Sequence, residues 1–125
     1  MNIDDLTYGD LKKIAALFSG NGEAKNAAID DHLIGKPVII RTYSAGVHFG
    51  ILDARNGAEV RLRDTRRIWY WEKAFTLSQV SQDGVGGNTK MPAAIPEIIL
   101  TECVEILPCS EKAAECLRSY NVHEV

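Results

Sequence analysis

The chain has helical patterns of hydrophobic residues near its two ends and strand patterns between them. Near the N-terminus, Thr7 and Asp10 can form a capping box that precedes an apolar stripe at helical spacing, made of Leu11, Ile14, Ala15, Leu17 and Phe18. Near the C-terminus, Ser110 can cap a helix whose packing face holds Ala113, Ala114, Cys116 and Leu117. A short helix is also predicted from Leu77, ended by the glycines of residues 84–87.

The central region predicts antiparallel strands. Residues 38–43 have the pattern of a buried strand, and residues 47–52 alternate in the manner of a second. Asn56-Gly57 is the strongest hairpin signal, because both residues tolerate the positive φ angles of a type I′ turn. The returning strand is predicted from Val60 to Trp71, and residues 97–107 are predicted as one last long strand.

This order of elements predicts an α+β fold. We expect an antiparallel β-sheet meander with an N-terminal helix, a short helix after the third strand and a C-terminal helix. The length of 125 residues favours a single domain, 1–125. Within it, residues 1–34 would form a helical extension, and residues 36–120 a β-rich core with the C-terminal helix.

Charge and composition narrow the function classes. The formal net charge of −3 argues against a duplex nucleic acid binder that relies on phosphate neutralisation. No apolar run is long enough to cross a bilayer, and the start of the chain lacks signal-peptide features, so we expect a cytosolic protein. The three cysteines, Cys103, Cys109 and Cys116, lack a metal-binding spacing and are expected to be free thiols.

The segment at residues 66–71 (RRIWYW) concentrates binding chemistry. Arg66 and Arg67 can pair with phosphate oxygens, and Trp69 and Trp71 can stack on bases, so the segment suggests a nucleotide ligand. The alternative is a strand whose aromatic residues pack the core while the arginines are solvated. In an unbroken strand, alternation would place Arg61, Arg63, Arg67, Trp69 and Trp71 on one face, whereas a bulge near Asp64-Thr65 would change that partition.

Two further segments offer ligand contacts. Residues 44–46 (SAG) form a small-residue break where backbone amides could approach a ligand, or else a tight turn or bulge between two strands. Around the break, Thr42, Ser44 and His48 could supply hydrogen bonds. The Gly/Asn-rich residues 84–88 are predicted as a loop, with a lid over a pocket as the alternative. The sequence shows no nucleophile elbow, zinc-deaminase spacing or helical histidine pair, and this favours a binding protein over an enzyme.

The segments RTYSAGVHFG (41–50), RRIWYW (66–71) and LSQ (77–79), followed by residues 97–100 and 106–109, resemble the first type of phage Thoeris anti-defence protein. The resemblance covers roughly residues 36–115. It implies a sponge that binds cyclic ADP-ribose isomers of Thoeris immunity without degrading them, in the cytoplasm of the infected bacterial host. It also implies a homo-oligomer, dimer or hexamer, with pockets between subunits, and in some members binding of CBASS cyclic di- or trinucleotides.

The expected ligand-binding residues combine this resemblance with the chemistry of the side chains. They are Arg66, Arg67, Trp69, Trp71, Phe49, Phe75, Thr42, Ser44, Ala45, Gly46, Thr76, Ser78 and Asn88. We expect no catalytic residue, metal or cofactor. The alternatives are an enzyme that degrades a cyclic nucleotide signal and a protein–protein inhibitor module that uses the arginine and aromatic run as its hot spot.

Overall fold

The computed structural model describes residue 29 and residues 31–123 of the chain. The chain divides into two units, residues 1–32 and 33–125, and the fold below belongs to the second. The predicted N-terminal helix, with its stripe from Leu11 to Phe18, lies outside the described residues. A 3-10 turn, Asp31–Leu33 (η2), precedes the first strand.

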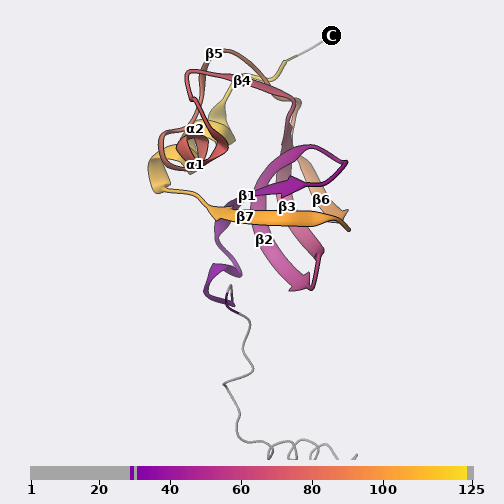
Figure 1. Ribbon diagram of the computed structural model, residues 1–125. Helices are drawn as coiled ribbons and strands as arrows, with labels where there is room; N and C mark the ends of the chain where they lie inside the picture. Colours follow the sequence, from indigo (N-terminus) through magenta and orange to yellow (C-terminus); the bar gives the residue numbers. More distant parts are fainter. Residues whose placement is uncertain (1–28, 30, 124–125) are drawn as a thin grey trace, which may run out of the picture. The chain divides into compact units, whose positions relative to one another are not determined.

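The main sheet has five strands in the order β6-β3-β2-β1-β7, and every neighbouring pair is antiparallel (Figure 1). Its strands are β1 (Pro37–Thr42), β2 (Val47–Asn56), β3 (Glu59–Ile68), β6 (Ile95–Leu100) and β7 (Cys103–Pro108). A smaller sheet pairs β4 (Tyr70–Glu72) with β5 (Gly86–Lys90). The helices are α1 (Leu77–Asp83) and α2 (Glu111–Ser119). The predicted α+β class, the short mid-chain helix and the C-terminal helix are confirmed.

Three local predictions were wrong. The hairpin turn between β2 and β3 uses Gly57-Ala58, because Asn56 already pairs with Glu59. Only Gly57 of that turn has a positive φ, which fits a type II′ turn rather than type I′. The Gly/Asn segment predicted as a loop forms β5 instead.

The predicted last long strand is also two strands, which pair with opposite edges of the sheet. β6 pairs with β3 and β7 pairs with β1, although only Thr101 and Glu102 separate them. Two intervening residues span roughly 10 Å at most, so the two edges of the sheet approach each other at this end. The main sheet is therefore more than a simple meander, since its last two strands close it from both sides.

A bulge in β3 decides which way its side chains point. Phe49 pairs with Arg66 while Ile51 pairs with Arg63, so Gly50 faces the two residues between them. One of these, Asp64, has a φ of 50°. A Cβ on Gly50 would lie 3.1 Å from the Arg63 carbonyl oxygen, so the close approach of the strands favours glycine here.

The bulge considered from the sequence is therefore present, and the single-face arrangement of an unbroken strand is wrong. Arg63 pairs with Ile51 and Arg66 pairs with Phe49 across the strands, so Arg63 and Arg66 lie on the same side of the sheet. Arg67 lies on the other side.

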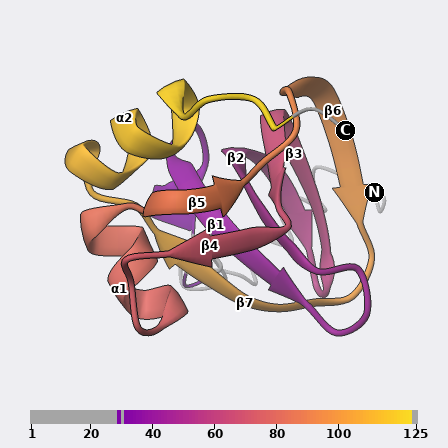
Figure 2. The same ribbon diagram turned by 90° about the horizontal axis from the view of Figure 1, so that it is seen from above.

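Two hydrophobic clusters occupy the two sides of the sheet. Leu33, Val38, Ile40, Leu52, Val60, Leu62 and Leu100 form one of them. The other joins residues of the sheet to both helices and contains Ile39, Phe49, Ile68, Val80, Met91, Ala114 and Leu117. Figure 2 shows α1 and α2 beside each other, with β4 and β5 next to them. The helices therefore cover the second side of the sheet, where apolar residues of α1 and α2 complete the core.

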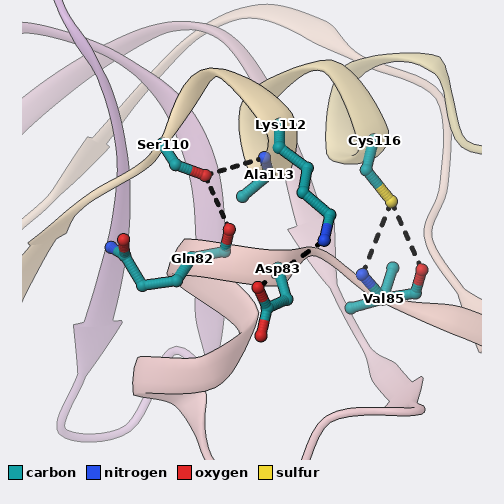
Figure 3. Close-up of polar contacts among 7 residues, drawn as sticks. All are labelled: Gln82, Asp83, Val85, Ser110, Lys112, Ala113 and Cys116. Carbon is teal, nitrogen blue, oxygen red and sulfur yellow. Dashed lines mark hydrogen bonds and ion pairs between the residues drawn. The ribbon is translucent and has the colours of Figure 1, made fainter.

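Polar contacts fix α2 to the chain that leads into β5 (Figure 3). The Ser110 hydroxyl accepts from the Ala113 amide at 3.0 Å and donates to the Gln82 carbonyl at 2.7 Å, so one side chain caps α2 and binds α1. The Cys116 sulfur lies 3.4 Å from the Val85 nitrogen and 3.3 Å from its oxygen. These contacts hold the start of β5 and so help to place Lys90 at its end.

Candidate functional site

A groove of about 350 Å³ lies where β3 ends and β5 leads toward β6. We call it the Trp69 groove, and its lining residues are Arg67, Trp69, Lys90, Met91, Pro92 and His123. Its volume falls at the lower end of the range for small-molecule pockets. The groove combines an aromatic ring, two basic side chains and an apolar wall.

Backbone contacts hold the parts of the Trp69 groove together. The Trp69 amide donates to the Lys90 carbonyl at 3.1 Å, and the His123 amide donates to the Met91 carbonyl at 2.9 Å. The Trp69 and His123 rings stack with centroids 6.4 Å apart, and the Lys90 ammonium lies 5.3 Å from the indole centroid. The indole is nevertheless 67% exposed. It therefore offers surface for a further planar ring.

The charges of the two cations in the groove are not paired within the described residues. Within residues 31–123, neither Arg67 nor Lys90 makes a side-chain hydrogen bond or ion pair. The Glu72 carboxylate accepts hydrogen bonds from the Asn88 backbone amide and the Tyr70 hydroxyl, and these bonds lower its pKa. The charge of Lys90 also acts on Glu72, but with a smaller effect. Arginine and lysine side chains free of acidic partners are suited to phosphate oxygens.

A second, smaller cavity of about 170 Å³ shares Arg67 and Pro92 with the Trp69 groove. We call it the Thr65 cavity, and it is also lined by His48, Thr65, Ala93, Ile95 and Ile98. His48 is buried, with Nε2 2.9 Å from the Ala45 carbonyl oxygen. Burial lowers the pKa of His48, the contact with Ala45 acts in the opposite direction, and the charge of Arg67 lowers it further. The ring is therefore neutral near pH 7.

Arg66 lies in a different environment from Arg67. It is 4% exposed, and its guanidinium donates to four backbone carbonyl oxygens. Nε donates to Pro92 at 2.9 Å, Nη1 to Leu117 at 2.9 Å and Tyr120 at 2.8 Å, and Nη2 to Met91 at 3.3 Å. These bonds join the C-terminal end of α2 to the wall of the Trp69 groove. The structure thus gives Arg66 a structural position rather than the phosphate contact expected from the sequence.

Two of the expected stacking residues belong to the core. Phe49 is buried in the cluster beneath the helices, and Trp71 is partly buried against the same cluster. Phe49 also lines another cavity of about 350 Å³, with Ile51, Asp64, Arg66, Ala94 and Arg118. The cations of that cavity are engaged, because Arg66 binds carbonyls and Arg118 lies 3.5 Å from a Glu115 oxygen. It is therefore less suited to an anion than the Trp69 groove.

The small-residue break at residues 44–46 lies in a turn that Thr42 closes. The Thr42 hydroxyl donates to the Gly46 carbonyl at 2.8 Å and accepts from the Ala45 amide at 2.8 Å. The Ser44 hydroxyl donates to Glu102. Gly46 has a φ of 86°, which suits glycine. The groups expected to meet a ligand instead bind one another or Glu102, which supports the tight-turn alternative.

The remaining expected residues do not line the Trp69 groove. Thr76 caps α1, accepting from the Gln79 amide at 3.2 Å, and Ser78 is exposed within that helix. Phe75 is 92% exposed just before α1. Asn88 is exposed on β5, and its amide donates to Glu72 at 2.8 Å. Of the thirteen expected residues, the structure therefore brings only Arg67 and Trp69 together in this groove.

Sequence reasoning missed Lys90, His123 and Thr65, and His48 was a candidate hydrogen-bonding residue that was not in the final expected set. Lys90 follows a glycine-rich stretch that the sequence predicts to be a loop. No sequence pattern therefore indicated that the backbone of Lys90 would bond to that of Trp69. His123 stands near the C-terminus without a motif around it, yet its backbone amide donates to the Met91 carbonyl and its ring stacks on Trp69. Thr65 was noted only as a possible bulge position. The register that places it beside His48 and Arg67 depends on that bulge.

Over residues 35–117, the chain matches the sequence profile of a domain of unknown function, DUF6948. The chain belongs to the DUF6948 family. The matched span contains every lining residue of the Trp69 groove except His123. No curated protein matches the chain.

Within the described residues, no three His, Cys, Asp or Glu side chains are grouped as a metal site would require. Burial raises the pKa of the Cys109 thiol to about 12, which disfavours a thiolate nucleophile there. No helix within residues 31–123 is long and apolar enough to span a membrane.

Proposed function

We propose that this DUF6948 protein is a phage anti-defence sponge that binds and sequesters cyclic ADP-ribose isomers of Thoeris immunity without degrading them. It would act in the cytoplasm of the infected bacterial host. The proposal extends to the cyclic di- and trinucleotides of CBASS, at the same or separate sites. It rests on the sequence resemblance together with the contents of the Trp69 groove.

The observation that carries the proposal is the combination of Arg67, Lys90 and Trp69 in one groove. A cyclic ADP-ribose isomer contains a pyrophosphate and a planar base. Arg67 and Lys90, which have no ionic partner within residues 31–123, suit the first, and the exposed indole suits the second. A sponge needs binding groups, and the Trp69 groove offers them.

The exposure of Trp69 supports an oligomeric form of the proposal. Sequestration requires slow release, and slow release favours a ligand that is largely enclosed. One chain leaves most of the indole open. A second subunit laid over the Trp69 groove would enclose the ligand, in keeping with the dimer or hexamer that the resemblance implies.

The test is calorimetric titration with cyclic ADP-ribose isomers and with cyclic di- and trinucleotides. Bound ligand is then released by heat and identified by chromatography. We expect tight binding of at least one cyclic ADP-ribose isomer and its recovery unaltered. Recovery of an altered ligand would instead make the protein an enzyme, and no binding to any of these ligands would overturn the sponge.

Matched variants locate the binding site. Arg67→Ala and Lys90→Ala should each weaken affinity roughly 10- to 100-fold, since each removes a charge-assisted contact. Arg61→Ala is the control, because Arg61 lies on the same strand but pairs with Asp53 at 2.7 Å. If Arg61→Ala weakens binding as much as Arg67→Ala, the ligand does not occupy the Trp69 groove.

A further inference from the structure

The Thr65 cavity contains a polar group whose hydrogen bonding is incomplete. Thr65 is 2% exposed, and its hydroxyl oxygen is the one buried side-chain polar atom without a hydrogen-bond partner in the described part of the chain. An unpaired buried hydroxyl destabilises a fold, and most such groups in proteins have partners. A buried hydroxyl that lacks a partner beside a cavity is therefore suited to a partner from outside the chain.

The neighbour of Thr65 in this cavity supplies complementary chemistry. His48 Nε2 lies 2.9 Å from the Ala45 carbonyl oxygen, which can only accept a hydrogen bond. Nε2 therefore carries the proton, and Nδ1 of the neutral ring is an acceptor. The Thr65 hydroxyl can donate or accept. Together the two side chains offer the groups that a hydroxyl-bearing ligand requires.

The position of the Thr65 cavity indicates which part of a nucleotide it would receive. It shares Arg67 and Pro92 with the Trp69 groove. In a nucleotide the sugar lies between the base and the phosphate. A base on Trp69 and a phosphate at Arg67 would therefore bring a sugar to the mouth of this cavity. A volume of about 170 Å³ suits one edge of a sugar better than a second base.

We propose that the Thr65 cavity is a ribose subsite, in which Thr65 and His48 bind a ribose 2′-hydroxyl and so select ribonucleotides over 2′-deoxyribonucleotides. This inference rests on the proposed function, because it assumes a nucleotide in the Trp69 groove. It adds a source of selectivity that the cations and the indole lack, since phosphates and bases are common to both kinds of nucleotide.

The experiment compares cyclic ADP-ribose with its two analogues that each lack one ribose 2′-hydroxyl, using the full chain. The wild-type protein should bind one of the analogues about tenfold more weakly, the loss expected for one hydrogen bond to a buried group. Thr65→Val keeps the shape of the side chain and removes the hydroxyl, so it should abolish this difference. Thr65→Ser keeps the hydroxyl and should preserve it.

Thermal unfolding provides a readout that separates binding from folding. Because Thr65→Val removes an unpaired buried hydroxyl, its melting temperature without ligand should equal or exceed that of the wild type. Equal binding of all three ligands by the wild type would overturn the ribose subsite and leave the sponge standing, as would a preference that Thr65→Val leaves unchanged. Failure of the wild type to bind any of the three would overturn both this subsite and the binding of cyclic ADP-ribose.

Discussion

Arg66 and Arg67 are adjacent in the sequence and chemically identical, yet the structure places them in opposite environments. Arg66 is buried and donates to four backbone carbonyl oxygens, whereas Arg67 lines the Trp69 groove without an ionic partner among the described residues. The difference arises because consecutive residues of a strand point to opposite sides. A motif of two arginines therefore need not be a motif for two phosphate contacts.

Among the variants that test this comparison, we expect Arg66→Ala to cause the largest loss of stability. The substitution removes the guanidinium donor from four carbonyl oxygens, of which the Met91 oxygen keeps the His123 amide, and it empties the space of the guanidinium. We expect a loss of about 3–5 kcal/mol in the free energy of unfolding. Urea denaturation monitored by circular dichroism would measure it.

Arg67→Ala is the matched control for that experiment. An exposed side chain without an ion pair contributes little to stability, so we expect a change within about 0.5 kcal/mol. The comparison breaks if the two variants lose similar stability, because Arg66 would then not hold the fold in the way its hydrogen bonds indicate.

The two tryptophans extend the comparison to aromatic residues. Trp71 packs against the core beneath the helices, so Trp71→Ala should lower the free energy of unfolding by about 2–3 kcal/mol. Trp69 is mostly exposed, so Trp69→Ala should change stability by less than about 1 kcal/mol while weakening nucleotide binding. Denaturation and calorimetric titration of both variants would test this. Equal loss of affinity in both would contradict the separation of their roles.

A third prediction concerns the bulge that sets the directions of β3. In Gly50→Ala, the new methyl group would lie 3.1 Å from the Arg63 carbonyl oxygen and from Thr65 Cβ. We expect a loss of about 1–3 kcal/mol from this overpacking, measured by thermal unfolding. Ala54→Gly on the same strand is a control for backbone entropy alone. If Gly50→Ala is as stable as the wild type, the strands are not held at this close distance.

Much of the fold could be predicted because its signals are local. The apolar run at residues 38–40, the alternation at residues 47–52 and the cap at Ser110 each depend on a few neighbouring residues. The division of residues 97–107 into β6 and β7 depends instead on pairing with opposite edges of the sheet. The local pattern of an apolar run does not indicate which edge of the sheet each half of the run will pair with.

The candidate site could be predicted only in part, for a related reason. Arg67 and Trp69 were found because their side chains carry recognisable chemistry in one short segment. Lys90 and His123 reach the Trp69 groove through backbone bonds to residues far away in the chain, which single residues do not reveal. Arg66 was assigned to the ligand because its chemistry matches that of Arg67. Only the tertiary structure shows that the Arg66 guanidinium already donates to backbone carbonyl oxygens.

The smallest predicted effect concerns His48, whose pKa is lowered by burial and by the charge of Arg67, against the raising effect of Ala45. Because the folded state holds the proton less tightly than the unfolded state, the unfolded state takes up a proton first as the pH falls below about 6.5. Proton uptake then favours unfolding. We therefore expect the contribution of His48 to the free energy of unfolding to decrease from pH 7 toward pH 5.

His48→Gln isolates this contribution, since an amide can still donate to the Ala45 carbonyl but does not titrate. Carboxylates titrate in both proteins, so the difference between their stability curves reports His48. The wild type should lose more stability than the variant between pH 7 and pH 5 in urea denaturation. In an Arg67→Ala background that difference should shrink, because one cause of the lowered pKa is gone. An unchanged difference would mean that the charge of Arg67 does not affect the pKa of His48. Arg67 would then line both cavities without coupling them electrostatically.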